Sequence, residues 1–515
     1  MGTYNAASWL LDRNIDEGRA DQVAVRYRGR DVTYGEMQAL TWRVQHALAA
    51  LGVDRDERVV LVTNDSPEMI AWLLGAMRSG VVPVPVSTML RPADVAAIAA
   101  DAGAAALVLS TDHLAHADAC TDLVAGLRRV VHLDEEGDAS TPDRCTAWSE
   151  FDDAQEAAVA DTSADSPAFW LYSSGTTGLP KGVMHLHRNM QATYEAYAKE
   201  VLKVGAQDRF LSVAKLFFAY GLGNSLTFPF GAGATTILEP QRPTPPGMCA
   251  LVASERPTLF FAAPGFVAAV LDTPVETDAF SSVRATVTAG ESLPADLQRR
   301  FSERFGHPVL DGIGSTEALH IFISNRLDAQ APGSSGWAVP GYEVKLLGDD
   351  DKEITDSDTP GYLHVRGPST AAGYWQRPEA TAAAFREGGW LRTGDVYVRS
   401  EGDSWTFLGR NNDMIKAGGI WVSPAEVEAT LITHSSVLEA AVVGSRNAHG
   451  LEETVAFVVP RAGVTIDLDA IEAHCREHMA TYKRPRRIFV VDELPKTATG
   501  KIQRFKLRDS LTAEA

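Results

Sequence analysis

SSGTTGLPKG, residues 173–182, is the stretch of this sequence that constrains the fold and the function most. Its glycines let backbone N–H groups turn toward an anion, while its hydroxyl side chains and its lysine add donors and positive charge. The run FWLY just before it, residues 169–172, is typical of a strand. We therefore expect a phosphate-binding loop after a strand, with the candidate residues Ser173, Ser174, Gly175, Thr176, Thr177, Gly178 and Lys181.

The loop differs from the Walker pattern. That pattern places four residues between a glycine and a Gly-Lys-Ser/Thr triplet, whereas Lys181 here follows Pro180 and precedes Gly182. The spacing disfavours a P-loop kinase or GTPase. A flexible Ser/Gly linker has a similar composition, but the strand that leads directly into the stretch favours phosphate binding.

Length and composition indicate a globular enzyme of two or more domains. The chain has 515 residues, of which 45% are hydrophobic and 22% charged. A formal net charge of −20 disfavours nucleic acid or an anionic membrane as a partner. No secretory signal or membrane-spanning run is visible, which predicts a cytoplasmic protein. Four cysteines without a CxxC pair indicate neither a zinc site nor a disulfide framework.

Short β-branched runs alternate with alanine-rich helical stretches, which predicts α/β layers with parallel sheets. After about residue 335 the pattern becomes β-rich, and after residue 410 a new alternation begins. We expect a large multi-subdomain N-terminal domain with a small β-rich unit over residues 1–410. A small mobile α+β C-terminal domain should span 411–515. The expected strands are 59–62, 81–86, 105–110, 130–133, 209–213, 235–238, 258–262, 342–347 and 361–366, and the clearest helix is 67–79.

Further motifs follow the loop in a fixed order: DGIGSTE (311–317), TGD (393–395), GR (409–410) and PKTATGK (495–501). Together with the loop they resemble the adenylate-forming superfamily over almost the whole chain. The stretches AKLFFAYGLGN (214–224) and GIGSTEALHIFISN (312–325) are similar to its benzoate:CoA ligase branch. The resemblance implies an ATP-dependent, AMP-forming acid–thiol ligase. Such an enzyme would convert an aromatic acid to an acyl-adenylate and then transfer it to CoA, with ATP, Mg²⁺ and CoA as cofactor and co-substrates.

The resemblance assigns catalytic roles to Lys501, Glu317 and Thr316. Lys501 would place a flexible cation at the substrate carboxylate and the α-phosphate. Glu317 would hold Mg²⁺, a metal that prefers oxygen ligands, and Thr316 would donate its hydroxyl to a phosphate. Considered alone, Lys501 is also consistent with a solvated tail lysine, and Glu317 with the capping of a helix over residues 318–323.

The same resemblance divides the remaining candidates among three sites. The nucleotide site adds Gly290, Glu291, Ser292, Asp311, Gly312, Asp395 and Arg410, with Asp395 accepting from the ribose hydroxyls. The acid pocket comprises Phe218, Ala219, Tyr220, Gly314, His320 and Ile321. His320 is expected to contact the substrate without transferring a proton. An aromatic run such as FFAY (217–220) is also consistent with plain core packing.

In the C-terminal part, Lys416, Gly418 and Gly419 are expected to line a tunnel for the pantetheine arm of CoA. Asn412 occupies the hinge position, where the superfamily usually has aspartate. Asparagine keeps the shape of that residue but carries no charge. We therefore expect a working hinge with an altered balance between two conformations. Trp421, just after the tunnel glycines, is a second departure from the pattern.

Several alternatives remain open from the sequence alone. A bulkier cyclic acid, or an acyl carrier protein in place of CoA, would fit the same chemistry. A luciferase-like oxygenase that oxidises its adenylate, or a non-catalytic nucleotide-binding module, would fit the same fold. Retention of Lys501, Glu317 and Asp395 argues against the last of these. The expected partners are small molecules, with no nucleic acid and no membrane, and the protein is expected to be a monomer or a homodimer.

Overall fold

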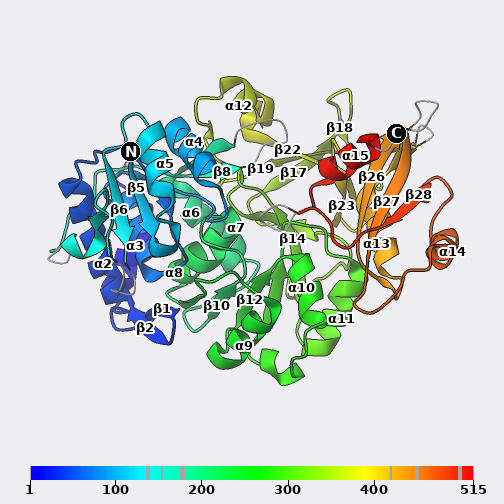
Figure 1. The fold of residues 1–515 in the computed structure, drawn as a ribbon, viewed down its shortest axis with the longest axis horizontal. Coiled ribbons are helices and arrows are strands. Elements are labelled where there is room, and N and C mark those ends of the chain that lie inside the picture. The colour runs from blue at the N-terminus through cyan, green and yellow to red at the C-terminus, as the bar shows by residue number, and fades with distance from the viewer. Residues whose placement is uncertain are drawn as a thin grey trace.

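The computed structural model describes residues 2–134, 140–151, 155–173, 180–417, 420–446, 452–496 and 502–513. Its architecture is mixed α/β with several sheets, two of them largely parallel, which confirms the predicted fold class. In Figure 1 the blue N-terminal sheet lies at one end of the molecule, and the orange and red C-terminal elements lie at the other. In the described part of the chain, no helix is long and apolar enough to cross a membrane.

The first sheet has five parallel strands in the order β4-β3-β5-β6-β7. Its interior strand β5 is buried at every residue, as expected for a parallel strand covered on both faces. The strands are β3 (Arg58–Val62), β4 (Val82–Pro85), β5 (Ala104–Ser110), β6 (Arg129–Leu133) and β7 (Thr146–Ala147). The neighbouring helices are α1 (Arg13–Asp16), α2 (Tyr34–Ala50), α3 (Pro67–Arg78), α4 (Pro92–Ala102) and α5 (His116–Leu123).

Helix α3 shows how the sequence sets this packing. Ser66 caps it, because the Ser66 hydroxyl accepts a hydrogen bond from the Met69 N–H at 3.2 Å, and Pro67 occupies the first turn. A Cβ added at Gly75 would lie 2.6 Å from Val44 Cβ, so α2 and α3 approach closely only because this residue is glycine. The helix is buried along almost its whole length.

The second sheet has nine strands in the order β16-β15-β14-β13-β12-β10-β11-β1-β2. Its central pairs from β14 to β1 are parallel, while β15, β16 and β2 are antiparallel additions at the two edges. The strands are β1 (Val23–Tyr27), β2 (Arg30–Thr33), β10 (Arg209–Ser212), β11 (Thr235–Leu238), β12 (Leu259–Ala262), β13 (Ala285–Thr288), β14 (Val309–Gly314), β15 (Ile321–Ser324) and β16 (Trp337–Ala338). Helices of this part are α6 (His187–Thr193), α7 (Ala219–Leu222), α8 (Phe228–Ala232), α9 (Pro245–Glu255), α10 (Pro264–Leu271) and α11 (Ala295–Phe305).

Two smaller antiparallel sheets complete the N-terminal part. One contains β17 (Glu343–Leu347), β18 (Glu353–Ile354), β19 (Gly361–Arg366), β21 (Phe385–Arg386), β22 (Trp390–Arg399) and β23 (Trp405–Arg410). The other, which we call the loop sheet, contains β8 (Pro167–Ser173), β9 (Lys181–Leu186) and β20 (Gly373–Tyr374). Helix α12 (Pro378–Ala384) follows β20. The β-rich region predicted after residue 335 is therefore confirmed.

Strands and helices alternate again after residue 410. A hairpin of β24 (Ile415–Ala417) and β25 (Ile420–Val422) precedes a sheet of β26 (Val437–Arg446), β27 (Glu452–Pro460) and β28 (Arg487–Val490). The helices are α13 (Pro424–Ile432), α14 (Leu468–His478) and α15 (Arg504–Ala513). These elements enclose an apolar core of their own. The domain boundary at 410/411 stays a prediction.

One local expectation is wrong. The sequence after Glu317 was consistent with a helix over 318–323, but the chain makes a turn and enters strand β15 at Ile321. Leu319 has a positive φ of 68° in this turn, which ends any helical course. Strand β15 then pairs antiparallel with β14, so the turn returns the chain along the same edge of the sheet.

Candidate active site

The two ends of the predicted phosphate loop lie side by side. Strand β8 ends at Ser173 and strand β9 begins at Lys181, and these two residues are paired in the antiparallel ladder. The strand predicted before the loop is therefore present, and both loop ends are fixed by the loop sheet. Ser174, Gly175, Thr176, Thr177 and Gly178 lie outside the described residues.

Thr316 and Glu317 are held against this loop sheet. The ring Nε2 of His185, in β9, lies 2.8 Å from the carbonyl oxygen of Thr316. The Ala371 N–H donates to the carbonyl oxygen of Glu317 at 2.8 Å. The hydroxyl of Tyr374, in β20, donates to Glu317 Oε1 at 2.9 Å. The predicted metal-associated carboxylate thus lies beside the strands that carry the phosphate loop.

Asp395 and Arg410 form an ion pair in the same region. They are paired residues of β22 and β23, with 3.0 Å between Arg410 Nε and Asp395 Oδ1. The Asp395 carboxylate, and more weakly Glu317, raises the pKa of Arg410 above its ordinary value. Arg410 therefore lies within electrostatic reach of both carboxylates, which brings three of the predicted residues together.

Two predicted nucleotide segments follow neighbouring strands of the large sheet. Gly290, with a φ of +98°, comes two residues after β13 and is followed by Glu291 and Ser292. Asp311 lies in β14, where its carboxyl accepts a hydrogen bond from the Thr288 hydroxyl at 2.7 Å. Burial raises the pKa of Asp311 to about 8. Asp311 is thus anchored inside the sheet, and its role toward a nucleotide stays a prediction.

The fold requires glycine at positions 312 and 314 for steric reasons. A Cβ at Gly312 would lie 2.8 Å from the Ile323 carbonyl oxygen, and a Cβ at Gly314 would lie 2.5 Å from the His320 carbonyl oxygen. Both glycines therefore allow β15 to fold back tightly on β14. This close return places His320 and Ile321 next to the end of β14.

His320 is the centre of a buried aromatic cluster. Its ring centroid lies 5.3 Å from that of Tyr220, 4.5 Å from that of Phe228 and 5.5 Å from that of Tyr197. Its Nε2 lies 3.1 Å from Asn224 Oδ1. Burial lowers the pKa of His320 to about 3, so the imidazole is neutral at physiological pH. This agrees with a substrate-contact role without proton transfer, although the role itself stays a prediction.

The other residues predicted for the acid pocket are close in the chain to this cluster. The Tyr220 hydroxyl donates to the Val287 carbonyl oxygen at 2.9 Å, which fixes α7 against β13. Phe218 precedes Ala219 at the start of α7 and is half-buried, with its ring 4.5 Å from that of Phe217. The predicted aromatic pocket and the predicted nucleotide segments therefore adjoin at the ends of β13 and β14.

A divalent cation fits the donor set at Glu317. Tyr374 engages Oε1, and the carboxylate lies near the ends of the phosphate loop. Within the described ranges, no group of three His, Cys, Asp or Glu side chains is arranged to hold a metal. One carboxylate combined with substrate phosphates and water is the usual environment of Mg²⁺, so the residues present fit that ion.

The C-terminal candidates are only partly described. Lys416 lies in β24, while Gly418, Gly419 and Lys501 lie outside the described residues. Asn412 is exposed in the turn that follows β23. Asn412 is not among the non-glycine residues of positive φ in the described chain, so this turn does not use the left-handed conformation that asparagine tolerates.

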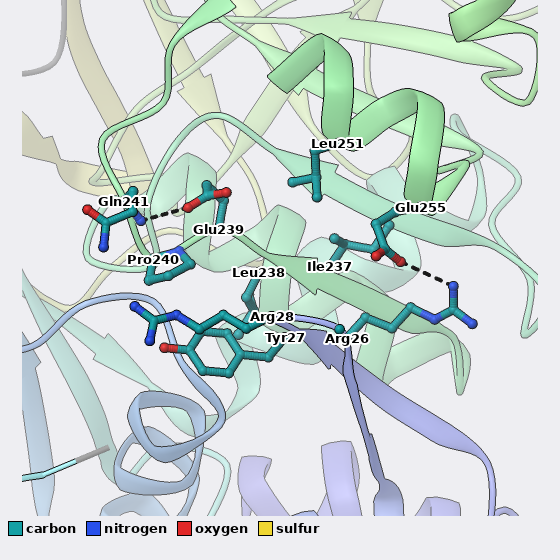
Figure 2. Close-up of a pocket in the computed structure, with 11 residues that line it drawn as sticks. Arg26, Tyr27, Arg28, Ile237, Leu238, Glu239, Pro240, Gln241, Leu251 and Glu255 are labelled. Carbon is teal, nitrogen blue, oxygen red and sulfur yellow. Dashed lines mark hydrogen bonds and ion pairs between the residues drawn. The ribbon is translucent and has the colours of Figure 1, made fainter. Parts of the chain in front are cut away.

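A cavity of about 280 Å³ lies away from all these residues. It opens between β1, the end of β11 and α9, and none of the predicted site residues lines it (Figure 2). Arg26 forms an ion pair across it with Glu255 at 3.2 Å, and the Gln241 N–H donates to Glu239 at 2.8 Å. Arg26 and Glu255 thus neutralise each other at this cavity.

Comparison with known proteins identifies the family of this chain. The family model described as AMP-binding enzyme matches residues 11–375, and the AMP-binding enzyme C-terminal domain matches residues 426–501. The chain belongs to the AMP-binding enzyme family.

Individual AMP-binding enzymes cover the chain almost completely. Benzoate–CoA ligase of Thauera aromatica is 41% identical over 98% of this chain and 96% of its own length. The structure of a benzoate CoA ligase from Burkholderia xenovorans LB400 is similar with a TM-score of 0.90 and 40% identity, covering 98% of this chain and 100% of that one. The structure of the anthranilate CoA ligase AuaEII with anthranoyl-AMP has a TM-score of 0.93 and 36% identity, covering 100% of this chain and 98% of that one.

Sequence reasoning missed several long-range contacts of this AMP-binding enzyme, two of which involve predicted site residues. Tyr374 binds Glu317 from 57 positions away, and Asn224 binds His320 from 96 positions away. In the C-terminal part, Arg504 pairs with Glu428, with 2.7 Å between Nη2 and each carboxylate oxygen. Asn224 belongs to the stretch 214–224 that resembles the family, so that resemblance contained a signal for it. Tyr374 lay outside every such motif.

Proposed function

We propose that this chain is an ATP-dependent, AMP-forming ligase that joins benzoate or a substituted benzoate to CoA. The observation that carries the proposal is the turn between β14 and β15. Glu317 and His320 lie three positions apart in it, one facing the loop sheet and the other in the aromatic cluster. A single turn thereby joins a site for phosphates to a site for a flat ring. The names of the similar ligases support the same assignment.

The aromatic cluster favours an aryl acid, but it provides no positive charge for the carboxylate of that acid. Tyr220, Phe228 and the neutral His320 offer ring faces and edges to a flat substrate. Because His320 stays neutral, it supplies no cation to the carboxylate of the acid. That charge must come from elsewhere, and Lys501 is the residue we assign to it.

In the first half-reaction, a carboxylate oxygen of the acid attacks the α-phosphorus of ATP. A new oxygen–phosphorus bond forms, the bond to the bridging oxygen breaks, and pyrophosphate leaves. Negative charge grows on the phosphoryl oxygens during this step, and we assign its stabilisation to Lys501 and Lys181. When bound at Glu317, Mg²⁺ would neutralise phosphate charge. Asp395 accepts from the ribose hydroxyls, and Arg410 pairs with that carboxylate.

In the second half-reaction, the C-terminal domain rotates about Asn412 and withdraws Lys501. Lys416, Gly418 and Gly419 then line the path by which the CoA thiol reaches the acyl carbon. The thiol gives its proton to solvent, the carbon–sulfur bond forms, and AMP leaves with the electrons of the broken carbon–oxygen bond. We place the enzyme in the cytoplasm, where ATP and CoA are available, as a monomer or a homodimer.

A panel of aryl, alicyclic and fatty acids tests the proposal. Acid-dependent exchange of pyrophosphate into ATP reports the first half-reaction, and thioester formation reports the second. We expect benzoate and its small derivatives to give the highest kcat/KM, with free CoA as the acceptor. A preference for fatty or alicyclic acids would overturn the aryl assignment.

The same assay tests which thiol accepts the acyl group and whether the reaction is a ligation or an oxidation. A holo-carrier protein replaces CoA in parallel reactions, and each reaction is repeated without oxygen. We expect a thioester with free CoA in the absence of oxygen. An oxidised product that requires oxygen would instead indicate an adenylating oxygenase, and thioester formation on the carrier protein alone would exclude CoA as the acceptor.

A further inference from the structure

The short segment 371–374 ties the loop sheet to the Glu317 turn. The Ala371 N–H donates to the carbonyl oxygen of Glu317 at 2.8 Å, and the next residue, Ala372, donates to the Met184 carbonyl oxygen at 2.9 Å. Gly373 and Tyr374 then pair with Met184 and Val183 as strand β20. One segment of four residues therefore touches both the strand that follows the phosphate loop and the residue assigned to the metal.

The side chain of Tyr374 makes the same connection at two points. Its hydroxyl donates to Glu317 Oε1 at 2.9 Å, and the Lys181 Nζ lies 5.0 Å from the centroid of its ring. The second distance is that of a cation–π contact. Tyr374 is 9% exposed, so its hydroxyl is a buried donor whose acceptor is the Glu317 carboxylate.

We propose that Tyr374 is a positioning residue that couples Lys181 to Glu317 in the first half-reaction. Its hydroxyl engages one oxygen of the Glu317 carboxylate and so orients the other toward the metal. Its ring supports the ammonium group of Lys181 at the start of β9. This proposal rests on the proposed function, because it takes Glu317 as the Mg²⁺ ligand and Lys181 as a phosphate contact.

A purely structural role for Tyr374 makes different predictions. The ring also packs against Val183 and Ala371, and its centroid lies 5.4 Å from that of Phe385. Phenylalanine at this position retains the ring, its packing and its face toward Lys181, and removes only the hydroxyl. If Tyr374 acted through packing alone, Tyr374→Phe would leave both nucleotide binding and its dependence on Mg²⁺ unchanged.

Tyr172 offers a matched control in the same sheet. Its hydroxyl donates to Asp101 Oδ2 at 2.8 Å, so it is also a partly buried tyrosine that binds a carboxylate. Asp101 is additionally paired with Arg377 at 2.6 Å. Tyr172→Phe therefore removes the same kind of hydrogen bond without touching the Glu317 carboxylate.

The experiment measures nucleotide affinity by calorimetry with α,β-methylene-ATP, with and without Mg²⁺. For Tyr374→Phe we expect the affinity to fall about tenfold with Mg²⁺ present, since hydrogen bonds to charged groups are among the stronger ones. Without Mg²⁺ the affinity should match that of the wild type. The Mg²⁺ concentration for half-maximal pyrophosphate exchange should rise by a similar factor. Thioester formation from added benzoyl-adenylate should keep its rate, and Tyr172→Phe should show none of these changes.

A double-mutant cycle decides whether Tyr374 acts through Glu317. In a Glu317→Gln background, Tyr374→Phe should cause no further loss of Mg²⁺-dependent affinity. An equal loss in both backgrounds, or a loss that is the same without Mg²⁺, would overturn the proposal. If no acid supports exchange in the wild type, the proposed function falls separately, and the calorimetric cycle still decides the role of Tyr374.

Discussion

Asp395 and Arg410 face each other across strands β22 and β23, and their ion pair lies just before the predicted hinge. The Asp395 side chain is 5% exposed, whereas that of Arg410 is 52% exposed. Arg410 Nη1 also donates to the Thr393 carbonyl oxygen at 3.1 Å. The guanidinium is therefore held at the turn, where it pairs with a buried carboxylate at the proposed ribose site.

Asp395→Asn removes this charge and retains the size of the side chain. Ribose is present in both ATP and the acyl-adenylate, so we expect the KM for each to rise about tenfold, as for a lost hydrogen bond to a charged group. Pyrophosphate exchange and thioester formation from added adenylate measure the two effects. Asp403→Asn is the control, because Asp403 forms an exposed pair with Arg399 in the same sheet. Loss in the first half-reaction alone would contradict a ribose contact.

Lys501→Ala is expected to separate the two half-reactions. Removing the cation that faces the developing charge should slow adenylate formation about a hundredfold or more. Conversion of added adenylate to thioester should stay near the wild-type rate. Lys496→Ala is the matched control, since Lys496 belongs to the same PKTATGK motif and pairs with Glu439 at 2.6 Å. Equal loss of both half-reactions in Lys501→Ala would contradict the two-conformation mechanism.

Gly223→Ala tests the acid pocket without adding or removing a polar group. A Cβ at Gly223 would lie 2.3 Å from His320 Cδ2, so the imidazole must move out of its cluster. We expect the KM for the acid to rise about tenfold while the KM for ATP changes less than twofold. Gly402→Ala serves as control, because a Cβ there meets only the Ser400 hydroxyl at 3.8 Å. A rise in the KM for ATP alone would show that His320 does not contact the acid.

Most strands of the two parallel sheets could be predicted because they are buried on both faces. Strand β5 is an unbroken apolar run of this kind. Strand β4 contains Pro83 and Pro85, which disfavour a central strand, and it forms at the edge of its sheet, where a missing N–H is tolerated. The helix expected after Glu317 failed for a tertiary reason. Residues 321–324 pair with β14, and no local pattern shows that partner.

The functional site could likewise be predicted only in part from the sequence. Motif residues such as Glu317 and His320 could be assigned by resemblance, and the structure places both in one turn. Tyr374 could not be found, because its hydrogen bond to Glu317 spans 57 positions and depends on the pairing of β20 with β9. The pairing of Arg504 with Glu428 spans 76 positions, so it too depends on tertiary structure that no local pattern shows.

The buried His307 should make stability depend on pH. Its Nε2 lies 2.8 Å from the Thr286 hydroxyl, and burial lowers its pKa to about 4. The unfolded chain takes up a proton near pH 6.5 and the folded protein does not, so the stabilisation present above pH 6.5 is lost as the pH falls. Between pH 7 and pH 5 this loss is about 2 kcal/mol.

His307→Gln should reduce the fall in unfolding free energy over that range by the same amount. Urea denaturation at pH 7 and pH 5 measures the difference between the variant and the wild type. His46→Gln is the control, because His46 is exposed at the surface. If the variant and the wild type lose stability equally on acidification, His307 is already protonated in the folded protein.

The hinge turn is anchored on both sides of Asn412. On one side, the Asn411 N–H donates to the Gly394 carbonyl oxygen at 3.0 Å. On the other side, Arg508 of α15 pairs with Asp413 at 2.7 Å, so Asp413 is fixed to the C-terminal elements. Asn412 is the exposed residue between these two anchors. A rotation of the C-terminal domain would therefore concentrate its backbone changes at Asn412.

Asn412→Asp should change the balance between the two conformations. The variant adds a negative charge beside Asp413, and its interactions with Asp413, Arg410 and Arg508 differ before and after rotation. An exposed charge pair contributes up to about 1 kcal/mol, so the ratio of the two half-reaction rates should shift about two- to fivefold. Asn411→Asp adds the same charge on the anchored side and should shift the ratio less. An unchanged ratio in Asn412→Asp, with exchange and thioester formation measured separately, would exclude Asn412 as the pivot.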